Sequence, residues 1–163
     1  MVDQFRRRFF SRKQEADTHP RLPWLSGAVE FTDQCTRCNK CVNECETQII
    51  KHGSGGFPTI DFDLGECTFC YQCADVCPEP LFLSQNEMAW QAKAIINKDC
   101  LASKNVECRS CGDQCETMAI QFKLAVGKVA QPELNLDECN GCGACVSVCP
   151  TSSINVSIQN NER

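Results

Sequence analysis

The segment from Cys139 to Pro150 reads CNGCGACVSVCP, and its cysteine spacing decides the fold of the chain. The pattern C-x2-C-x2-C places three thiols on one tight loop, and the fourth cysteine follows after three more residues, directly before a proline. A 4Fe-4S cubane needs four thiolates, and this spacing supplies three from one loop while the fourth comes from elsewhere in the chain. The segment therefore predicts an iron-sulfur site and a second chain segment close to it.

Closely related groups of cysteines occur four times and use all sixteen cysteines of the 163-residue chain. The residue after the fourth cysteine alternates, with Glu46 and Glu116 in the odd groups and Pro78 and Pro150 in the even groups. This alternation indicates a duplicated two-group module. The groups are Cys35, Cys38, Cys41 and Cys45; Cys67, Cys70, Cys73 and Cys77; Cys100, Cys108, Cys111 and Cys115; and Cys139, Cys142, Cys145 and Cys149.

The pairing of the groups predicts which cysteines share a cluster. In the two-cluster arrangement, the fourth cysteine of each group ligates the cluster of the other group. The rule predicts four 4Fe-4S clusters in two crossed pairs. The predicted ligands are Cys35, Cys38, Cys41 and Cys77 for cluster 1; Cys67, Cys70, Cys73 and Cys45 for cluster 2; Cys100, Cys108, Cys111 and Cys149 for cluster 3; and Cys139, Cys142, Cys145 and Cys115 for cluster 4.

Cluster 3 departs from the pattern, because the seven residues LASKNVE separate Cys100 from Cys108. We expect this loop to bulge outward. The alternative is that Cys100 is a free thiol and that the site holds a three-iron cluster. Iron counting on protein purified without oxygen separates the two.

Zinc and disulfides are the other uses of such a cysteine density. Zinc sites pair two cysteine dyads across a longer loop, whereas three cysteines in one tight loop crowd a single ion. Disulfides need an oxidising compartment, but the basic segment Arg6 to Lys13 is followed by polar residues instead of the apolar region of an export signal. No apolar run approaches the length of a membrane span. We therefore expect a protein of the reducing cytoplasm whose cysteines bind iron.

The predicted fold class is α+β, with two tandem ferredoxin-like two-cluster modules of short strands and short helices. Apolar alternation predicts strands within 58–67 and 132–139, and glycines predict turns within 52–58 and 125–128. A brief helix is expected after each fourth cysteine, where proline suits a first helical position. The predicted boundaries are a basic N-terminal arm at 1–27, modules at 28–92 and 93–158, and a frayed tail at 159–163.

The net charge of the chain and the motifs that it lacks narrow the range of possible functions. The net charge is −5, and four clusters with their thiolates bring it to about −13, which argues against a nucleic-acid partner. Arg37, Lys40 and Arg109 are candidates to offset this charge, and ordinary solvated charge is the alternative reading. No nucleotide-binding glycine motif is present and no cysteine remains outside the four groups, which argues against an independent enzyme. The apolar fraction of 42% falls to about 32% without cysteine, so we expect the clusters to supply folding energy.

With these residues identified, the chain resembles the accessory polyferredoxin of periplasmic nitrate reductase systems, the NapF type. The resemblance runs from Leu22-Pro23-Trp24 to Pro150. Generic ferredoxins share only the four-cysteine motifs. The more specific elements are CTRC at Cys35 to Cys38, CTFCYQC at Cys67 to Cys73, the seven-residue interval after Cys100, and CNGCGAC at Cys139 to Cys145.

The resemblance implies a cytoplasmic protein that contacts the precursor of the molybdenum-containing catalytic subunit before its twin-arginine export. It also implies a role in helping that subunit to acquire or reduce its own iron-sulfur centre. Two alternatives stay open: a plain electron carrier of a nitrate reductase chain, and a structural adaptor whose clusters only hold the fold. The residues RRRFF at Arg6 to Phe10 resemble the core of a twin-arginine signal, and are either an inactive mimic of one or part of a basic arm that packs on the protein itself or on a partner.

Overall fold

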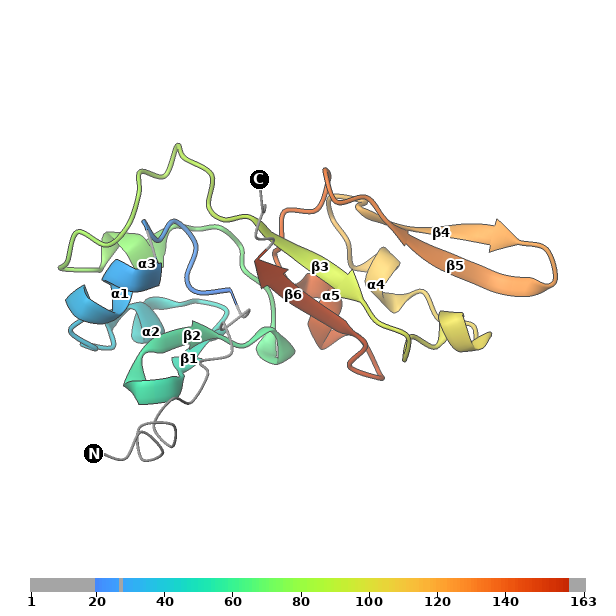
Figure 1. The fold of residues 1–163 in the computed structure, drawn as a ribbon, viewed down its shortest axis with the longest axis horizontal. Helices are drawn as coiled ribbons and strands as arrows, with labels where there is room; N and C mark the ends of the chain where they lie inside the picture. The colour runs from blue at the N-terminus through green and yellow to red at the C-terminus, as the bar shows by residue number, and fades with distance from the viewer. Residues whose placement is uncertain (1–19, 27, 159–163) are drawn as a thin grey trace, which may run out of the picture.

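The computed structural model describes residues 20–26 and 28–158, which form two halves arranged along the long axis of the molecule (Figure 1). We call the described residues up to 91 the first half and those from 92 the second half. The first half contains α1 (Ala28–Gln34), α2 (Lys40–Glu44), β1 (Ile50–His52), a 3-10 turn at Ser54–Gly56, β2 (Pro58–Ile60), a 3-10 turn at Phe62–Leu64 and α3 (Gln72–Asp75). The second half contains β3 (Ala92–Ile96), a 3-10 turn at Ala102–Lys104, α4 (Ser110–Asp113), β4 (Ile120–Ala125), β5 (Lys128–Leu134), α5 (Ala144–Ser147) and β6 (Ile154–Ile158).

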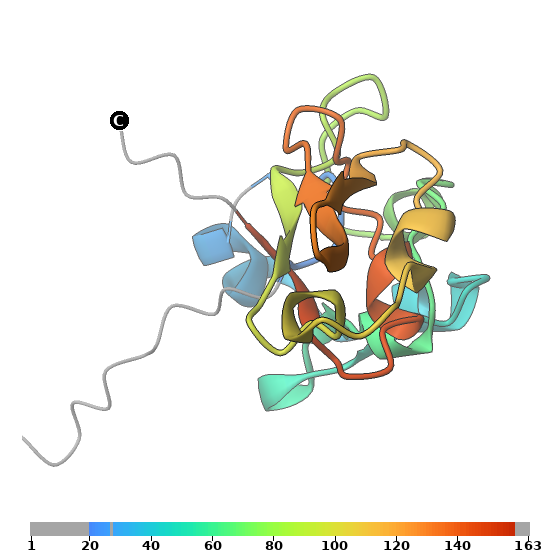
Figure 2. The same cartoon turned by 90° about the vertical axis from the view of Figure 1, so that its right-hand side faces the viewer.

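The strands of the described residues form three antiparallel pairs. β1 pairs with β2 in the first half, and β4 pairs with β5 in a longer hairpin of the second half. β3 and β6 also pair, so the first and last strands of the second half lie side by side. Figure 2 views the molecule from the end that carries the β4–β5 hairpin. Short helices and strands in two repeated units confirm the predicted mixed architecture.

The helices lie before the fourth cysteine of each group, and the prediction of a helix after it was wrong. α2, α3, α4 and α5 each contain the third cysteine of a group and end before the fourth. In three of the groups the residue before the helix is left-handed, at Asn39 (φ 65°), Tyr71 (φ 67°) and Gly143 (φ 84°). This sharp reversal sets the helix start inside the cysteine loop, so Pro78 and Pro150 follow in turns or bends rather than in a helix.

The predicted strands and turns are only partly correct. The turn within 52–58 is confirmed between β1 and β2, and that within 125–128 is confirmed between β4 and β5. The alternating pattern beyond Ile60 does not continue as a strand, because a 3-10 turn replaces it. The Asp61 carboxylate accepts a hydrogen bond from the Asp63 N–H at 3.1 Å and stabilises that turn. Likewise, β5 ends at Leu134 and Leu136 lies in a turn.

Residues 20–26 pack on the rest of the first half. Leu22 belongs to an apolar core that the first half shares with Ala92 of β3 and Val156 of β6. Trp24 is 5% exposed, with its ring edge-on to Tyr71 at 5.0 Å between centroids. The Trp24 C=O accepts from the Leu83 N–H at 2.7 Å. The other residues of the predicted basic arm, 1–19 and 27, and the predicted tail at 159–163 lie outside the described residues. Among those described, no helix has the length and apolar character needed to cross a membrane.

Candidate metal centres

The first half places one complete predicted cysteine set around a single cavity, which we call site 1. Three of its thiols come from the loop after α1 and from α2, and the fourth, Cys77, crosses over from the end of α3. Burial, together with the charges of Cys35 and Cys77, raises the pKa of Cys41 to about 11. The cysteines that line the cavity are Cys35, Cys38, Cys41 and Cys77.

Site 2 is the second group of thiols in the first half, made by Cys67, Cys70 and Cys73 with Cys45 from the first group. Burial and the charges of Cys70 and Cys45 raise the pKa of Cys67 to about 11. Burial and the charges of Cys67 and Cys70 raise the pKa of Cys73 to about 12, and Cys45 contributes to the same shift. Cys41 of site 1 also contributes to the shift at Cys73, and Cys41, Cys45 and Cys67 all pack against the apolar core that contains Cys73, so sites 1 and 2 are adjacent. Binding iron would displace the protons that burial retains.

Site 3, in the second half, includes Cys100, which seven residues separate from the next cysteine of its group. Cys100 lines a cavity together with Cys108, Cys111 and the crossing Cys149. Its other walls include Leu101 from the inserted loop and Phe122 from β4. The position of Cys100 therefore suits a fourth ligand better than an isolated thiol.

The inserted loop after Cys100 packs against the β4–β5 hairpin instead of standing free. Ala102 is fully buried, and its C=O accepts from Gln131 Nε2 at 2.8 Å. The Asn105 side-chain oxygen accepts from the Val129 N–H at 3.0 Å. Both bonds tie the loop to β5, so the insertion and the long hairpin support each other beside site 3.

Site 4 mirrors site 2. Its cavity is lined by Cys139, Cys142 and Cys145 with the crossing Cys115, and by both glycines of the loop, Gly141 and Gly143. Burial and the charges of Cys142 and Cys139 raise the pKa of Cys145 to about 12. Each half thus brings together two four-thiol sets, and each set takes its fourth cysteine from the other group of that half.

Left-handed residues stand on both sides of the second cysteine in three of the four groups. They are Arg37 and Asn39, Phe69 and Tyr71, and Gly141 and Gly143. Backbone that turns repeatedly in this way directs its N–H groups toward one concave side, where they attract negative charge, as in many iron-sulfur sites. In the sequence, only the glycines of the last group indicate a left-handed backbone. The four non-glycine residues were missed, because their identities give no sign of a left-handed backbone.

A further set of sulfur neighbours was not foreseen in the sequence. Thr47, Thr117 and Thr151 each follow a fourth cysteine by two residues, with Sγ to Oγ1 distances of 3.6, 3.6 and 3.8 Å. The sequence signal is C-x-T, which the second group lacks because Glu79 takes that place.

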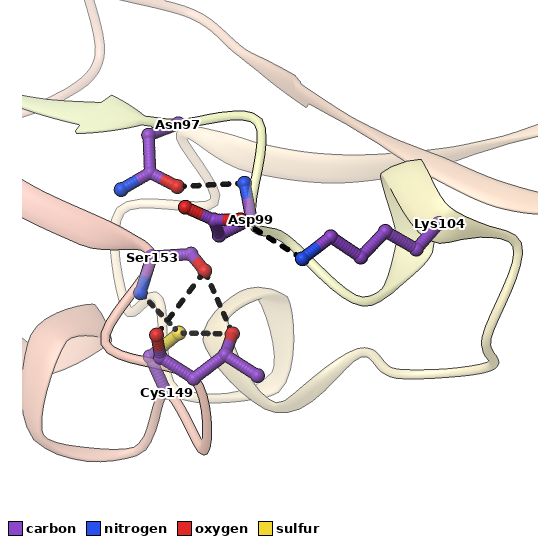
Figure 3. A network of polar contacts seen from close by, with 6 residues as sticks. Asn97, Asp99, Lys104, Cys149 and Ser153 are labelled. Carbon is purple, nitrogen blue, oxygen red and sulfur yellow. Dashed lines mark hydrogen bonds and ion pairs between the residues drawn. The ribbon is translucent and has the colours of Figure 1, made fainter.

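Cys149 is the most strongly hydrogen-bonded of these sulfurs. It accepts from the Ser153 N–H at 3.2 Å, and the Thr151 and Ser153 hydroxyls lie 2.7 Å apart beside it (Figure 3). Burial acts to raise the pKa of Cys149, but hydrogen bonds from the N–H groups of Ser153, Thr151 and Ile154 and from the Thr151 hydroxyl together outweigh it, so the pKa lies below its usual value. Such donors stabilise negative charge on a ligating sulfur.

The donor sets fit iron-sulfur clusters by their chemistry. Four thiols around one shared cavity suit a cube with four iron corners. Among the residues that the structure describes, no three His, Cys, Asp or Glu side chains are placed to hold a single metal ion.

Comparison with known proteins agrees with this chemistry. Residues 34–80 and 106–153 match the family described as 4Fe-4S dicluster domain. The chain is 44% identical over 154 residues to the ferredoxin-type protein NapF of Escherichia coli K12, covering 94% of each chain. It is 46% identical over 143 residues to NapF of Haemophilus influenzae, covering 87% of this chain and 81% of that one. The methylamine utilization ferredoxin-type protein MauM of Methylophilus methylotrophus is 28% identical over 161 residues, covering 87% and 71% of the two chains.

Proposed function

The chain belongs to the NapF family of ferredoxin-type iron-sulfur proteins, and from this premise we propose that it carries four 4Fe-4S clusters and serves a periplasmic nitrate reductase as a cytoplasmic accessory protein. In this role it binds the precursor of the catalytic subunit and assists assembly or reduction of that subunit's iron-sulfur centre before export. It acts without a nucleic-acid partner and without catalysing a reaction of its own.

The crossing cysteines carry the cofactor part of the proposal. Cys77 lines the cavity of the first group and Cys149 that of the third, although each belongs to the following group in the sequence. Cys45 and Cys115 cross in the opposite direction, to sites 2 and 4. Residues 34–80 and 106–153 each match a dicluster domain, which supports up to two clusters in each half, and the second match begins after Cys100. We propose module boundaries at 28–92 and 93–158, with the second module beginning one residue later than the start of β3 at Ala92.

The exposure of particular thiols supports a role with a protein partner. Cys38 of site 1 and Cys70 of site 2 are exposed. Electrons or iron can reach a partner there without passing through a thick protein layer. The basic residues of 1–27 are a further candidate contact with the precursor.

A plain electron carrier is the competing function, and precursor binding separates the two. Immobilised protein, loaded and kept without oxygen, is offered the cytoplasmic precursor and, separately, the mature periplasmic enzyme. The maturation role predicts capture of the precursor and a higher iron-sulfur content of precursor isolated from cells that contain this protein. Capture of the mature enzyme alone, with unchanged precursor content, would leave the carrier role.

A further inference from the structure

The two halves meet at a junction formed by the cysteine loops of sites 2 and 4. The Cys67 N–H donates to the Cys142 C=O at 2.8 Å, which links a residue of site 2 directly to a residue of site 4. Burial raises the pKa of Cys142, and the charge of Glu66, the residue before Cys67, adds to the effect. Thiol-bearing loops of different halves therefore lie in direct contact.

Glycine makes this close approach possible. Gly143 has φ 84°, and a Cβ at this position would overlap the ring of Phe62, which is 7% exposed. A Cβ on Gly141 would overlap the Ala92 carbonyl. The site 4 loop thus lies against the 3-10 turn of the first half on one side and β3 on the other, with no space for side chains.

Aromatic rings cover the junction. Trp90 Nε1 donates to the Asn140 C=O at 2.9 Å. Its ring lies edge-on to Phe62 and Phe69, with centroids 6.2 and 5.8 Å away. Phe69 lies inside the site 2 loop and Asn140 inside the site 4 loop, so Trp90 holds both.

Sites 1 and 3 lie away from this junction. The cavity of site 1 is lined by first-half residues such as Phe31 and Phe82, and that of site 3 by second-half residues such as Phe122 and Ile154. α2 packs against α3 and α4 against α5, so each outer site is next to the inner site of its own half. Figure 1 shows α5 toward the middle of the molecule and the β4–β5 hairpin at the far end.

We propose that the Cys67–Cys142 contact is the electron crossing between the halves, so that electrons pass in the order site 1, site 2, site 4, site 3, or the reverse. This rests on the proposed cluster content. Each step moves one electron: the giving site is oxidised by one electron, the receiving site is reduced by one, and no bond or proton changes. A one-electron reductant of low potential, dithionite in the test, supplies the electrons.

The test uses the loaded full-length chain with Gly143→Ala as the junction variant. A methyl group there forces the site 4 loop away from Phe62. The matched control is Gly127→Ala, since Gly127 has φ 72° and open space around it, so the backbone penalty is similar and the junction is untouched. After full reduction, paramagnetic resonance measures spin coupling within each pair and between the halves.

The proposal predicts that wild type and Gly127→Ala show coupling between the halves and that Gly143→Ala loses it while coupling within each pair persists. Unchanged inter-half coupling in Gly143→Ala would overturn the crossing. If Gly143→Ala loses iron, two double variants test the order of sites instead. Cys142→Ser with Cys145→Ser removes site 4 and should abolish spin coupling between the first half and site 3. Cys108→Ser with Cys111→Ser removes site 3 and should leave coupling between sites 2 and 4 in place. The reverse result also overturns the order. Fewer than about sixteen irons in wild type would instead contradict the proposed function.

Discussion

The two halves carry the same crossed cysteine pattern, but the pairing between the first and last segments of each half differs greatly in length. In the second half β3 and β6 pair from Ala92↔Ile158 to Ile96↔Ile154, whereas the first half has the single bridge Leu25↔Phe82 at the corresponding place. The first half adds aromatic packing of Trp24 on Phe69 and Tyr71. Crossed thiol sets can therefore organise a module with few paired strand residues, provided that other contacts, such as the packing of Trp24, close it.

Removal of iron should have the largest effect on the difference between the two halves. Because ligand binding supplies folding energy that the small apolar core lacks, we expect the iron-free protein to lose most of its structure. The residual structure should be unequal, with slower amide hydrogen exchange in β3 and β6 than in β1 and β2. Circular dichroism and hydrogen exchange, measured without oxygen after chelation, check this. Iron-free protein with an unchanged spectrum would show that the thiol sets do not hold the fold.

The next test compares matching first cysteines, Cys35 and Cys100. Each lines the cavity of an outer site, so Cys35→Ser and Cys100→Ser should each lower the iron content, by one iron if a three-iron cluster survives and by about four if the site is lost. Iron and sulfide analysis with paramagnetic resonance of the oxidised protein distinguishes these results. An unchanged iron content in Cys100→Ser alone would restore the reading of Cys100 as a free thiol.

The grouping of the thiols could be anticipated from the sequence because the spacing of cysteines limits which of them one loop can bring together. The match to a 4Fe-4S family supports iron binding, and the assignment of individual cysteines to each cluster stays a prediction. The left-handed backbone at Arg37 and Tyr71 could not be anticipated, because such residues disfavour it in isolation and the surrounding loop imposes it. The end of β2 at Ile60 also escaped prediction, since the following turn delivers Phe62 to Gly143, a residue far away in the sequence.

A smaller effect is expected from Leu22→Ala, which probes how the first half is closed. Leu22 is 3% exposed and lines site 1, and it belongs to an apolar core built mainly from first-half residues that also includes Ala92 and Val156 of the second half. Truncation of a buried leucine costs about 2–5 kcal/mol, so the first-half clusters should be lost at lower denaturant concentration while second-half spins persist. Cluster absorbance and paramagnetic resonance along a guanidinium series measure this. Leu124→Ala is the control, because Leu124 is 88% exposed. Simultaneous loss of both halves would mean that they unfold as one unit.

The smallest expected effect concerns the hydroxyl groups beside the sulfurs, which separate site 1 from the other three. Thr47, Thr117 and Thr151 lie beside cysteines of sites 2, 4 and 3, whereas Cys77 of site 1 has Glu79 at that position. A hydrogen bond to a ligating sulfur stabilises the more negative, reduced state. Thr47→Val should therefore lower the reduction potential of site 2 alone, while Thr47→Ser, which keeps the hydroxyl, should not. Redox titration followed by paramagnetic resonance measures both variants. Equal potentials in all three proteins would show that the Thr47 hydroxyl does not donate to the Cys45 sulfur.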